Sequence, residues 1–412
     1  MTNQEVFLGI LKQFIHPAET FSGIISEAEQ INVEDWEQII RLSVEHSVLP
    51  IIYEEAWKLT SFQNVPADVR AQLKGQVKRQ VIGQMQKTDA FLGLYRELTI
   101  QGITPLIMKG LVCREMYTNP DYRSSGDEDL LVKKDEFSKL DQILLRMGFE
   151  REVVEDVETA HEITYFNRRS GLHLEVHLTL FPEESGAYGQ LNEEFPQIFA
   201  RKVPQMVQGS EVYTLDWTQH MLYLLCHGLK HFLHCGFGIR QLMDMVKFAE
   251  TYGDRIDWEE VITRTKRQHM YVFWMNLFDI GERYLGFSWE KAHLQKPEQE
   301  LLHSEDMLWD ILDSGVYGHS TQDRSHSANI TLQAADRTEQ KRTGIAASLF
   351  PSMDYMSRQY PYLKEKKWLL PVAWASRIIA YASKTGGKGM ADAVETGRRR
   401  VDLLKSYGII EK

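Results

Sequence analysis

Apolar residues between positions 3 and 102 recur three or four places apart, which puts them on one side of a helix. Pro66 stands at the start of the longest such run, and proline is favoured in the first turn of a helix. From there the spacing continues without interruption as far as Leu98. We therefore predict a helical region over residues 1–102 that closes with one long helix.

The pattern changes after residue 102, where short apolar runs replace the helical spacing. A further helix is expected over residues 135–147 with Asp135 as its N-cap, and one or two helical turns over residues 111–117. Short apolar or alternating runs are typical of strands. The main candidates are residues 104–108, 127–132, 162–167 and 172–180. Residues 103–215 are therefore predicted to form a compact α/β core.

The helical period returns over residues 216–412, which are predicted to form a C-terminal helical domain. One stretch, around residues 319–342, is polar and poor in large apolar residues, and we expect it to be a mobile loop. The most apolar late stretch, residues 368–382, is interrupted by Pro371 and Arg377 and falls short of a membrane span. The predicted fold class is α+β, with a small mixed sheet flanked by N-terminal and C-terminal helical regions.

The composition is that of a globular protein with a sizeable core, since 43% of the 412 residues are hydrophobic and 25% are charged. The formal net charge of -11 argues against a generic electrostatic grip on nucleic acid, and a small molecule or a peptide is the favoured partner. The N-terminus lacks the pattern of a secretory signal, and we expect a cytoplasmic protein. The cysteines lack the spacing of a disulfide framework or a zinc knuckle and are expected to be buried thiols: Cys113, Cys226 and Cys235.

Two aspartates open the predicted strand 127–132. Asp127 and Asp129 are two positions apart, so on a strand they share one face at roughly 6.6 to 7 Å, while Glu128 points the other way. Carboxylate oxygens at an exposed strand end suit Mg²⁺, or Mn²⁺ in its place. The pattern is common, however, and taken alone it also fits an exposed strand end without a metal.

A third carboxylate is available on the predicted strand 172–180. Leu174 and Val176 would bury one face of this strand against helices, which leaves Glu175 on the polar face. If the strand lies beside the strand of Asp127 and Asp129, Glu175 completes a three-carboxylate metal site.

The residues ahead of the aspartates suit phosphate binding. Lys109 and Gly110 form a turn between a strand and a helix, where backbone N–H groups can hold a phosphate and Lys109 can add a positive charge. For Arg123 the alternative interpretation is an ion pair with Asp121 or another surface acid. The linking segment supplies further candidates: Arg123, Ser124, Ser125 and Gly126.

This succession of motifs resembles the family of uncharacterised nucleotidyltransferases within the polymerase-β-like superfamily. The resemblance is carried by a Met-Lys-Gly turn at 108–110, a Tyr-x-x-Pro loop at 117–120 followed by Arg123, a Gly-Asp-x-Asp-Leu-Leu-Val strand at 126–132, and an acid-x-His pair ending at His177. Two positions depart from the family pattern. Residue 128 is acidic where the family is usually apolar, which bears on metal affinity, and residue 175 is Glu where Asp is more frequent.

The resemblance implies a metal-dependent transfer of a nucleotidyl group from an NTP to an acceptor hydroxyl or phosphate. Asp127 and Asp129 would bind the metals, and Glu175 would assist the catalytic metal or accept the acceptor's proton. The phosphates of the nucleotide would be bound by Lys109, Gly110, Arg123, Ser124, Ser125, Gly126, His227, Lys230 and Arg240.

A helix predicted over residues 216–235 has leucines on one side and four histidines on the other: His220, His227, His231 and His234. As part of a helical domain that closes the cleft, it could present His227, Lys230 and His231 to phosphates. The alternatives are a solvated histidine face with an ordinary helical ion pair between Arg240 and Asp244, or a zinc site. The zinc interpretation lacks the glutamate of a His-Glu-x-x-His motif, because residue 228 is Gly.

Two other functions share the same residues. A related metal site could transfer a sugar from a nucleotide-sugar to a phosphate or peptide, because the same cations bind any diphosphate. Alternatively, the site could hold a nucleotide without turnover, as a binding module. The intact carboxylates argue against the second alternative, and the sequence leaves the acceptor open.

Overall fold

The computed structural model describes residues 2–17, 22–153, 160–234, 236–314, 360–376 and 389–410, together with isolated positions between 331 and 357. The chain begins with helices, as predicted, and the last of them starts directly after Pro66. These helices are α1 (Asn3–Ile15), α2 (Ser22–Ala28), α3 (Val33–Glu45), α4 (Leu49–Ala56) and α5 (Ala67–Ile100).

The middle of the chain forms one mixed sheet. In the described residues its strands lie in the order β3-β4-β5-β2-β1-β7-β6, with β2 parallel to β5, β1 parallel to β7 and the remaining pairs antiparallel. Helices α6 (Gly110–Arg114) and α7 (Phe137–Arg146) interrupt the run of strands. The strands are β1 (Leu106–Met108), β2 (Glu128–Leu131), β3 (Glu150–Arg151), β4 (Glu162–Asn167), β5 (Leu172–His177), β6 (Val203–Val207) and β7 (Ser210–Thr214).

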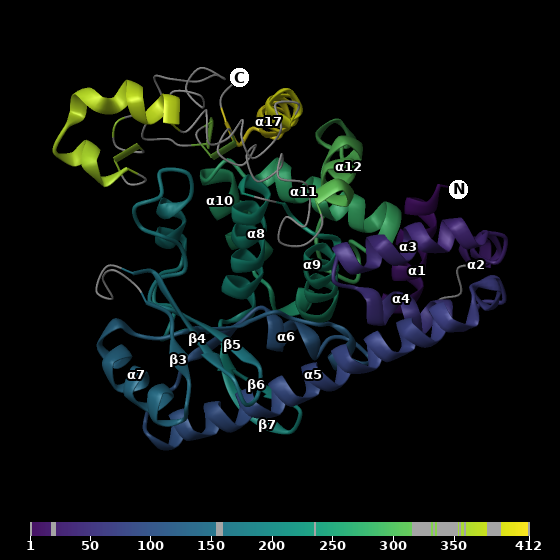
Figure 1. The fold of residues 1–412 in the computed structure, drawn as a ribbon, viewed down its shortest axis with the longest axis horizontal. Coiled ribbons are helices and arrows are strands. Elements are labelled where there is room, and N and C mark those ends of the chain that lie inside the picture. The colour runs from purple at the N-terminus through teal and green to yellow at the C-terminus, as the bar shows by residue number, and fades with distance from the viewer. Residues whose placement is uncertain are drawn as a thin grey trace.

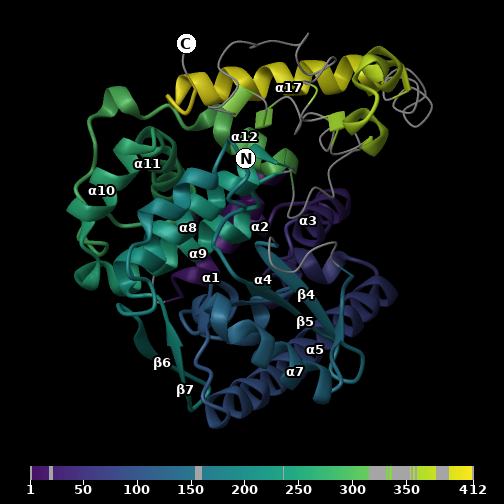
Figure 2. The same ribbon diagram turned by 90° about the vertical axis from the view of Figure 1, so that its left-hand side faces the viewer.

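The C-terminal part is again helical. Its long helices α8 and α9 stand on the opposite side of the sheet from α5 and α7, as Figure 1 and the perpendicular view in Figure 2 both show. The N-terminal helices lie beside α9, and α12 and α17 lie farthest from the sheet. The bounds are α8 (Trp217–Leu233), α9 (Ile239–Tyr252), α10 (Trp258–Arg267), α11 (Tyr271–Ile280), α12 (Glu305–Ser314) and α17 (Gly389–Ser406).

Alternation along the central strands divides the interior into two cores. Leu106 and Met108 of β1 belong to the larger core, which contains α8, α9 and the N-terminal helices. Ile107, between them, belongs to the smaller core with α7 and the C-terminal half of α5. Successive side chains of a strand point to opposite faces of the sheet, so any residue of β1 or β2 is committed by its position to one core. Leu131 lies on the α8 side and Leu130 on the α5 side.

Most predicted elements are confirmed, with local corrections. The predicted strand 172–180 ends earlier, at His177. The predicted cap at Asp135 is wrong, because Asp135 lies inside a 3-10 turn at Lys134–Glu136 and α7 begins only at Phe137. Glu136 occupies the N-cap position in a helical conformation and makes no side-chain cap hydrogen bond. A 3-10 turn at the start of a helix satisfies some of the end groups that a cap would otherwise serve.

The hairpin of β6 and β7 was not predicted from the sequence. Pro204 lies in β6, and proline is tolerated in a sheet only where its missing N–H is not needed, as on this edge strand. The two strands are joined by Gln208 and Gly209, whose φ angles of 44° and 77° are those of a tight hairpin turn. The Gln208-Gly209 pair was the signal in the sequence from which this hairpin turn could have been predicted.

Three further predictions concern the cysteines, the mobile loop and the possibility of a membrane span. Cys113 and Cys226 are buried thiols as predicted, and Cys235 lies outside the described residues. The predicted mobile loop at 319–342 also lies outside them, apart from residues 331–332 and 334–335. No described helix combines the length and the apolar character that crossing a membrane requires.

Candidate active site

The carboxylates of β2 and β5 meet across adjacent strands. The predicted neighbourhood of these strands is confirmed, and the register pairs Asp129 with Glu175. Both side chains lie on the face of the sheet turned toward α8, because Leu174 and Val176 fill the core on the other face. Asp127 immediately precedes β2 and lines the same pocket as Asp129.

Glu128 points to the other face of β2, as its position predicts. It is 1% exposed, and its carboxylate is paired with the Arg114 guanidinium and accepts a hydrogen bond of 2.8 Å from the Ser125 hydroxyl. A Cβ at Gly110 would come within 3.0 Å of Glu128 Oε2, so a larger residue in this turn would push the Glu128 carboxylate aside. The acid that departs from the family pattern is therefore compensated by Arg114 on the face away from Asp129.

Asp129 lies at the centre of a charged network. Its Oδ1 is 2.8 Å from Lys109 Nζ and 3.0 Å from His177 Nε2, and its side chain is almost entirely buried. Burial opposes ionisation of Asp129, but the Lys109 ammonium and His177 outweigh it and hold the pKa of the carboxyl below its usual range. Asp129 is therefore ionised in the folded protein.

His177 is a site residue for which no role was predicted beyond its place in the motif. Burial alone would lower its pKa, but hydrogen bonds to Asp129 and Glu175 raise it to about 9. Burial together with the charges of Asp129 and Asp127 raises the pKa of Glu175. One oxygen or nitrogen from each of Asp129, Glu175 and His177 lies within 4.8 Å of the others, which is close enough to share a metal ion.

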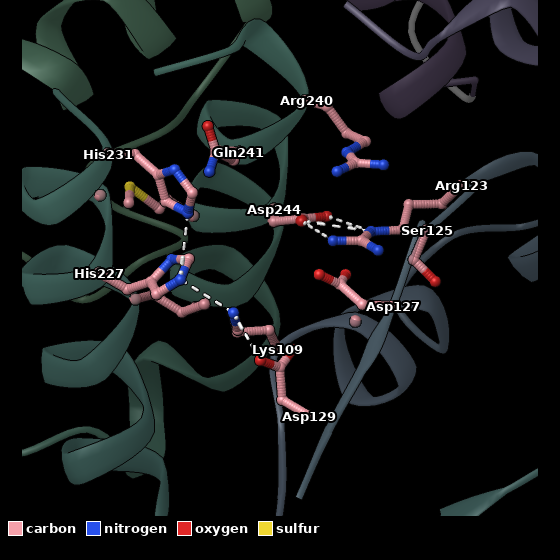
Figure 3. A pocket seen from close by; sticks show the side chains of 14 residues that line it. Lys109, Arg123, Ser125, Asp127, Asp129, His227, His231, Arg240, Gln241 and Asp244 are labelled. Atoms are coloured by element: carbon pink, nitrogen blue, oxygen red, sulfur yellow. Dashed lines mark hydrogen bonds and ion pairs between the residues drawn. The ribbon is translucent and has the colours of Figure 1, made fainter. Parts of the chain in front are cut away.

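Lys109 links the carboxylates to the helical part of the molecule. Its backbone is held at φ 49° and ψ -110°, outside the regions that non-glycine residues favour. Its N–H donates to His220 Nε2 at 3.3 Å, and its Nζ lies 2.8 Å from His227 Nε2. The predicted phosphate turn thus already commits one backbone donor to His220, while the ammonium faces the pocket between Asp129 and His227 (Figure 3).

Arg123 is paired with an acid far away in the sequence. Its Nη2 lies 2.5 Å from Asp244 Oδ2, and Tyr117 donates its hydroxyl to Asp244 Oδ1 at 3.0 Å. The alternative pairing of Arg123 with Asp121 is therefore not the one formed. The expected helical pair between Arg240 and Asp244 is also replaced, because Asp244 serves Arg123 and Arg240 donates to the Ser124 carbonyl oxygen.

The histidines of α8 face the interior, so the solvated-face interpretation is wrong. His220 is fully buried, with Nδ1 3.1 Å from the Thr214 hydroxyl. Burial, together with Lys109, lowers the pKa of His227 well below its usual value and that of His231 to about 3, so both are neutral near pH 7. His234 instead meets the Tyr188 hydroxyl at 2.6 Å.

The zinc interpretation of these histidines finds no support in the geometry. Among the described residues, the only group of three or more histidine, cysteine or acidic side chains close enough to share a metal is Asp129, Glu175 and His177. Gly228, where a glutamate would be needed, sits against α9. A Cβ at this position would approach Met245 Cε to 2.6 Å and Phe237 Cε2 to 2.9 Å.

A small pocket of about 40 Å³ lies between the sheet and helices α8 and α9. It also brings in His231, which was predicted to face the phosphates, and Gln241 and Asp244, for which no phosphate-contacting role was predicted. Glu175 and Lys230 do not line it, and Ser124 and Gly126 line a neighbouring cavity instead. The predicted residues that the pocket gathers are Lys109, Gly110, Arg123, Ser125, Asp127, Asp129, His227 and Arg240.

The mixed sheet with carboxylates on one face agrees with the nucleotidyltransferase core that the sequence motifs imply. The uncharacterised nucleotidyltransferase family matches residues 32–286, more than half of the chain, and the protein belongs to this family. Among solved structures, it is similar to an antigenic nucleotidyltransferase-like protein from Paracoccidioides brasiliensis. That similarity has 15% identity and a TM-score of 0.33, and it covers 53% of this chain and 96% of the other. No curated protein matches the sequence.

Proposed function

We propose that the protein transfers a nucleotidyl group from an NTP to a hydroxyl or phosphate of an acceptor, with Asp127, Asp129 and Glu175 as metal ligands. The observation that carries the proposal is the register that sets Asp129 beside Glu175, with Asp127 two residues earlier at the rim of the same pocket. Carboxylates gathered on one face of a sheet are the donor set that Mg²⁺ or Mn²⁺ prefers.

Asp129 and Glu175, together with His177, lie close enough to share a divalent cation, and Asp127 lies outside this group of three. Glu175 is partly buried near Asp127 and Asp129, and its raised pKa reflects burial and the negative charge of those two neighbours. A cation would offset that charge, as Lys109 and His177 do for Asp129 in the protein alone. A bound Mg²⁺ would supply the neutralisation of charge on the phosphate oxygens and the activation of the attacking hydroxyl.

The chain's own residues would orient the donor and handle the proton. Lys109 and Arg123 both line the pocket and supply positive charge for the phosphates, and Gly110 and Ser125 line it as well. His177, 3.0 Å from Asp129, would hold that carboxylate in place. Neutral His227, which lines the pocket, would be a secondary phosphate contact.

In the transfer itself, the acceptor oxygen forms a bond to the α-phosphorus while the bond to the leaving pyrophosphate breaks. Glu175 would act either as a ligand of the metal or as the base that receives the hydroxyl proton, and a raised carboxyl pKa suits the second role.

The same proposal divides the chain into three domains, at residues 1–102, 103–215 and 216–412. The active site would be built where the second and third domains meet.

The test is Mg²⁺-dependent binding of each NTP, measured by isothermal titration calorimetry, followed by mass spectrometry of the products formed with small-molecule and peptide acceptors. Asp127→Asn combined with Asp129→Asn should abolish both binding and transfer. Asp135→Asn is the matched control, since Asp135 is an exposed aspartate a few residues downstream. It should leave both unchanged.

Retention of activity in the double variant would remove the assignment. A parallel incubation with nucleotide-sugars tests the second donor class, because a sugar-modified product would identify that donor in place of an NTP. Tight NTP binding without any product from either donor would favour a binding module.

A further inference from the structure

A second cavity, of about 410 Å³, lies next to the active-site pocket. It is bounded by α3, the start of α4, the middle of α5 and residues 124–126 of the loop that leads into β2. Ser125 and Arg240 line both spaces, so the two are neighbours across this loop. Its size falls within the range of small-molecule sites, roughly 300 to 1,000 Å³.

The charged side chains that line this cavity are all positive. Arg79, Lys87 and Arg240 line it, and no aspartate or glutamate is among its lining residues. None of the three cations forms a salt bridge to an acid within the described part of the chain. In a protein with a net charge of -11, a wall with three cations and no acid is not a consequence of composition.

The cavity is also lined by buried donors that lack a partner. Gln84 is 1% exposed and Arg240 is 4% exposed, yet neither Gln84 Nε2 nor Arg240 Nε has a hydrogen-bond partner among the described residues. The Ser124 hydroxyl is likewise unpartnered, as is one acceptor of the same lining, Gln80 Oε1. Leaving a buried donor unsatisfied costs about 1 to 3 kcal/mol, so several in one place indicate a missing acceptor of hydrogen bonds.

Lys87 is directed toward the loop between the two spaces. Its Nζ donates to the Ser125 carbonyl oxygen at 2.6 Å, while Gln84 Oε1 accepts from the Ser125 N–H at 2.8 Å. These contacts hold the loop that presents Ser124 on one side and leads to Asp127 on the other. A ligand bound between Lys87 and Arg240 would therefore lie close to the carboxylates without occupying the donor's pocket.

We propose that this cavity binds the phosphate group of a small phosphorylated acceptor, held by Arg79, Lys87 and Arg240. The inference rests on the proposed function and narrows its acceptor. A phosphate supplies oxygens for the unpartnered donors and negative charge for the cations. The donor's phosphates are served by the other pocket, which contains Lys109 and Asp129. Ser124 and Gly126, predicted as donor contacts, would here serve the acceptor.

The experiment uses inorganic phosphate as the probe and the full-length chain. Phosphate binding is measured by ³¹P NMR with and without a saturating Mg²⁺ complex of an α,β-methylene NTP analogue, which fills the donor pocket. Arg79→Gln combined with Lys87→Gln should weaken phosphate binding at least tenfold in both conditions and weaken binding of the analogue by a smaller factor, since Lys87 also holds the Ser125 loop. Thermal unfolding of the double variant checks that it is folded.

Lys78→Gln is the matched control, since Lys78 is an exposed lysine on the same helix that does not line the cavity. It should leave phosphate binding unchanged. Equal phosphate affinity in the wild type and the folded double variant would overturn the proposal, as would an equal loss in the control. Loss of analogue binding with retained phosphate binding would also overturn it, by assigning the cations to the donor. Failure of the proposed function has a different signature, namely no Mg²⁺-dependent NTP binding by the wild type.

Discussion

Arg123 and Asp244 form a buried ion pair across 121 residues of sequence, with Nη2 and Oδ2 2.5 Å apart and both residues at most 5% exposed. The pair ties the loop before β2 to helix α9 and lies in the wall of the active-site pocket. Burial opposes the charge on Arg123, but Asp244 outweighs it and raises the pKa of the guanidinium above its usual value. The pocket therefore depends on the helical part of the chain for one of its walls.

Asp244→Ala is expected to destabilise the protein by about 3 to 5 kcal/mol, because it leaves the buried Arg123 charge and the Tyr117 hydroxyl without their acceptor. Urea unfolding followed by circular dichroism measures the change. Asp254→Ala, at an exposed aspartate just after α9, serves as the control and should cost less than about 0.5 kcal/mol. A loss of less than 1 kcal/mol at position 244 would contradict the structural role given to the pair.

Lys109→Met should strengthen the binding of Mn²⁺ to the nucleotide-free protein by about tenfold. The ammonium, 2.8 Å from Asp129 Oδ1, competes with a divalent cation for the same carboxylate, and tenfold corresponds to about 1.4 kcal/mol. The same variant should bind NTP more weakly, since it loses a proposed phosphate contact. Electron paramagnetic resonance of free Mn²⁺ reports the first effect, and Lys134→Met, at an exposed lysine, is the control. Unchanged Mn²⁺ affinity would show that Lys109 does not compete.

His177 predicts how the stability of the metal-free protein depends on pH. The folded-state pKa of about 9 exceeds the ordinary value of 6.5, so the protonated form is favoured by folding. This contribution is fully present below pH 6.5 and is lost as the pH rises through 9. His177→Gln should therefore lose stability relative to the wild type at pH 6, with the gap narrowing toward pH 9.5. Chemical unfolding at several pH values measures this, and a gap independent of pH would refute the assignment.

Replacing each of two helical glycines with alanine should change the stability of the protein in opposite directions. Gly228→Ala would drive a Cβ against Met245 and Phe237 between α8 and α9, at an expected cost of about 1 to 3 kcal/mol. Gly93→Ala on α5 meets no atom within 4 Å and should stabilise by about 0.5 to 1 kcal/mol, because alanine loses less conformational freedom on helix formation. Thermal and urea unfolding of both variants check the sign, and a neutral Gly228→Ala would mean that the two side chains shift at little cost.

Much of the fold could be predicted because its signals are local. Helix α5 begins where Pro66 predicts, and β2, β4 and β5 occupy the runs assigned to strands. The alternation of strand residues also predicted correctly that Glu128 opposes Asp129. The hairpin of β6 and β7 was missed, since its strands are short and one contains Pro204. The division of the chain into three domains and the roles of the individual site residues stay predictions.

The sequence by itself determined which residues share a face, because a strand repeats every two residues and a helix every 3.6 regardless of what surrounds them. Only the tertiary structure decided which faces meet. It paired Arg123 with Asp244 instead of Asp121, placed Lys109 between Asp129 and His227, and turned the histidines of α8 inward. These contacts join residues more than a hundred positions apart or on neighbouring strands, and they depend on how sheet and helices pack together, which no short-range spacing records.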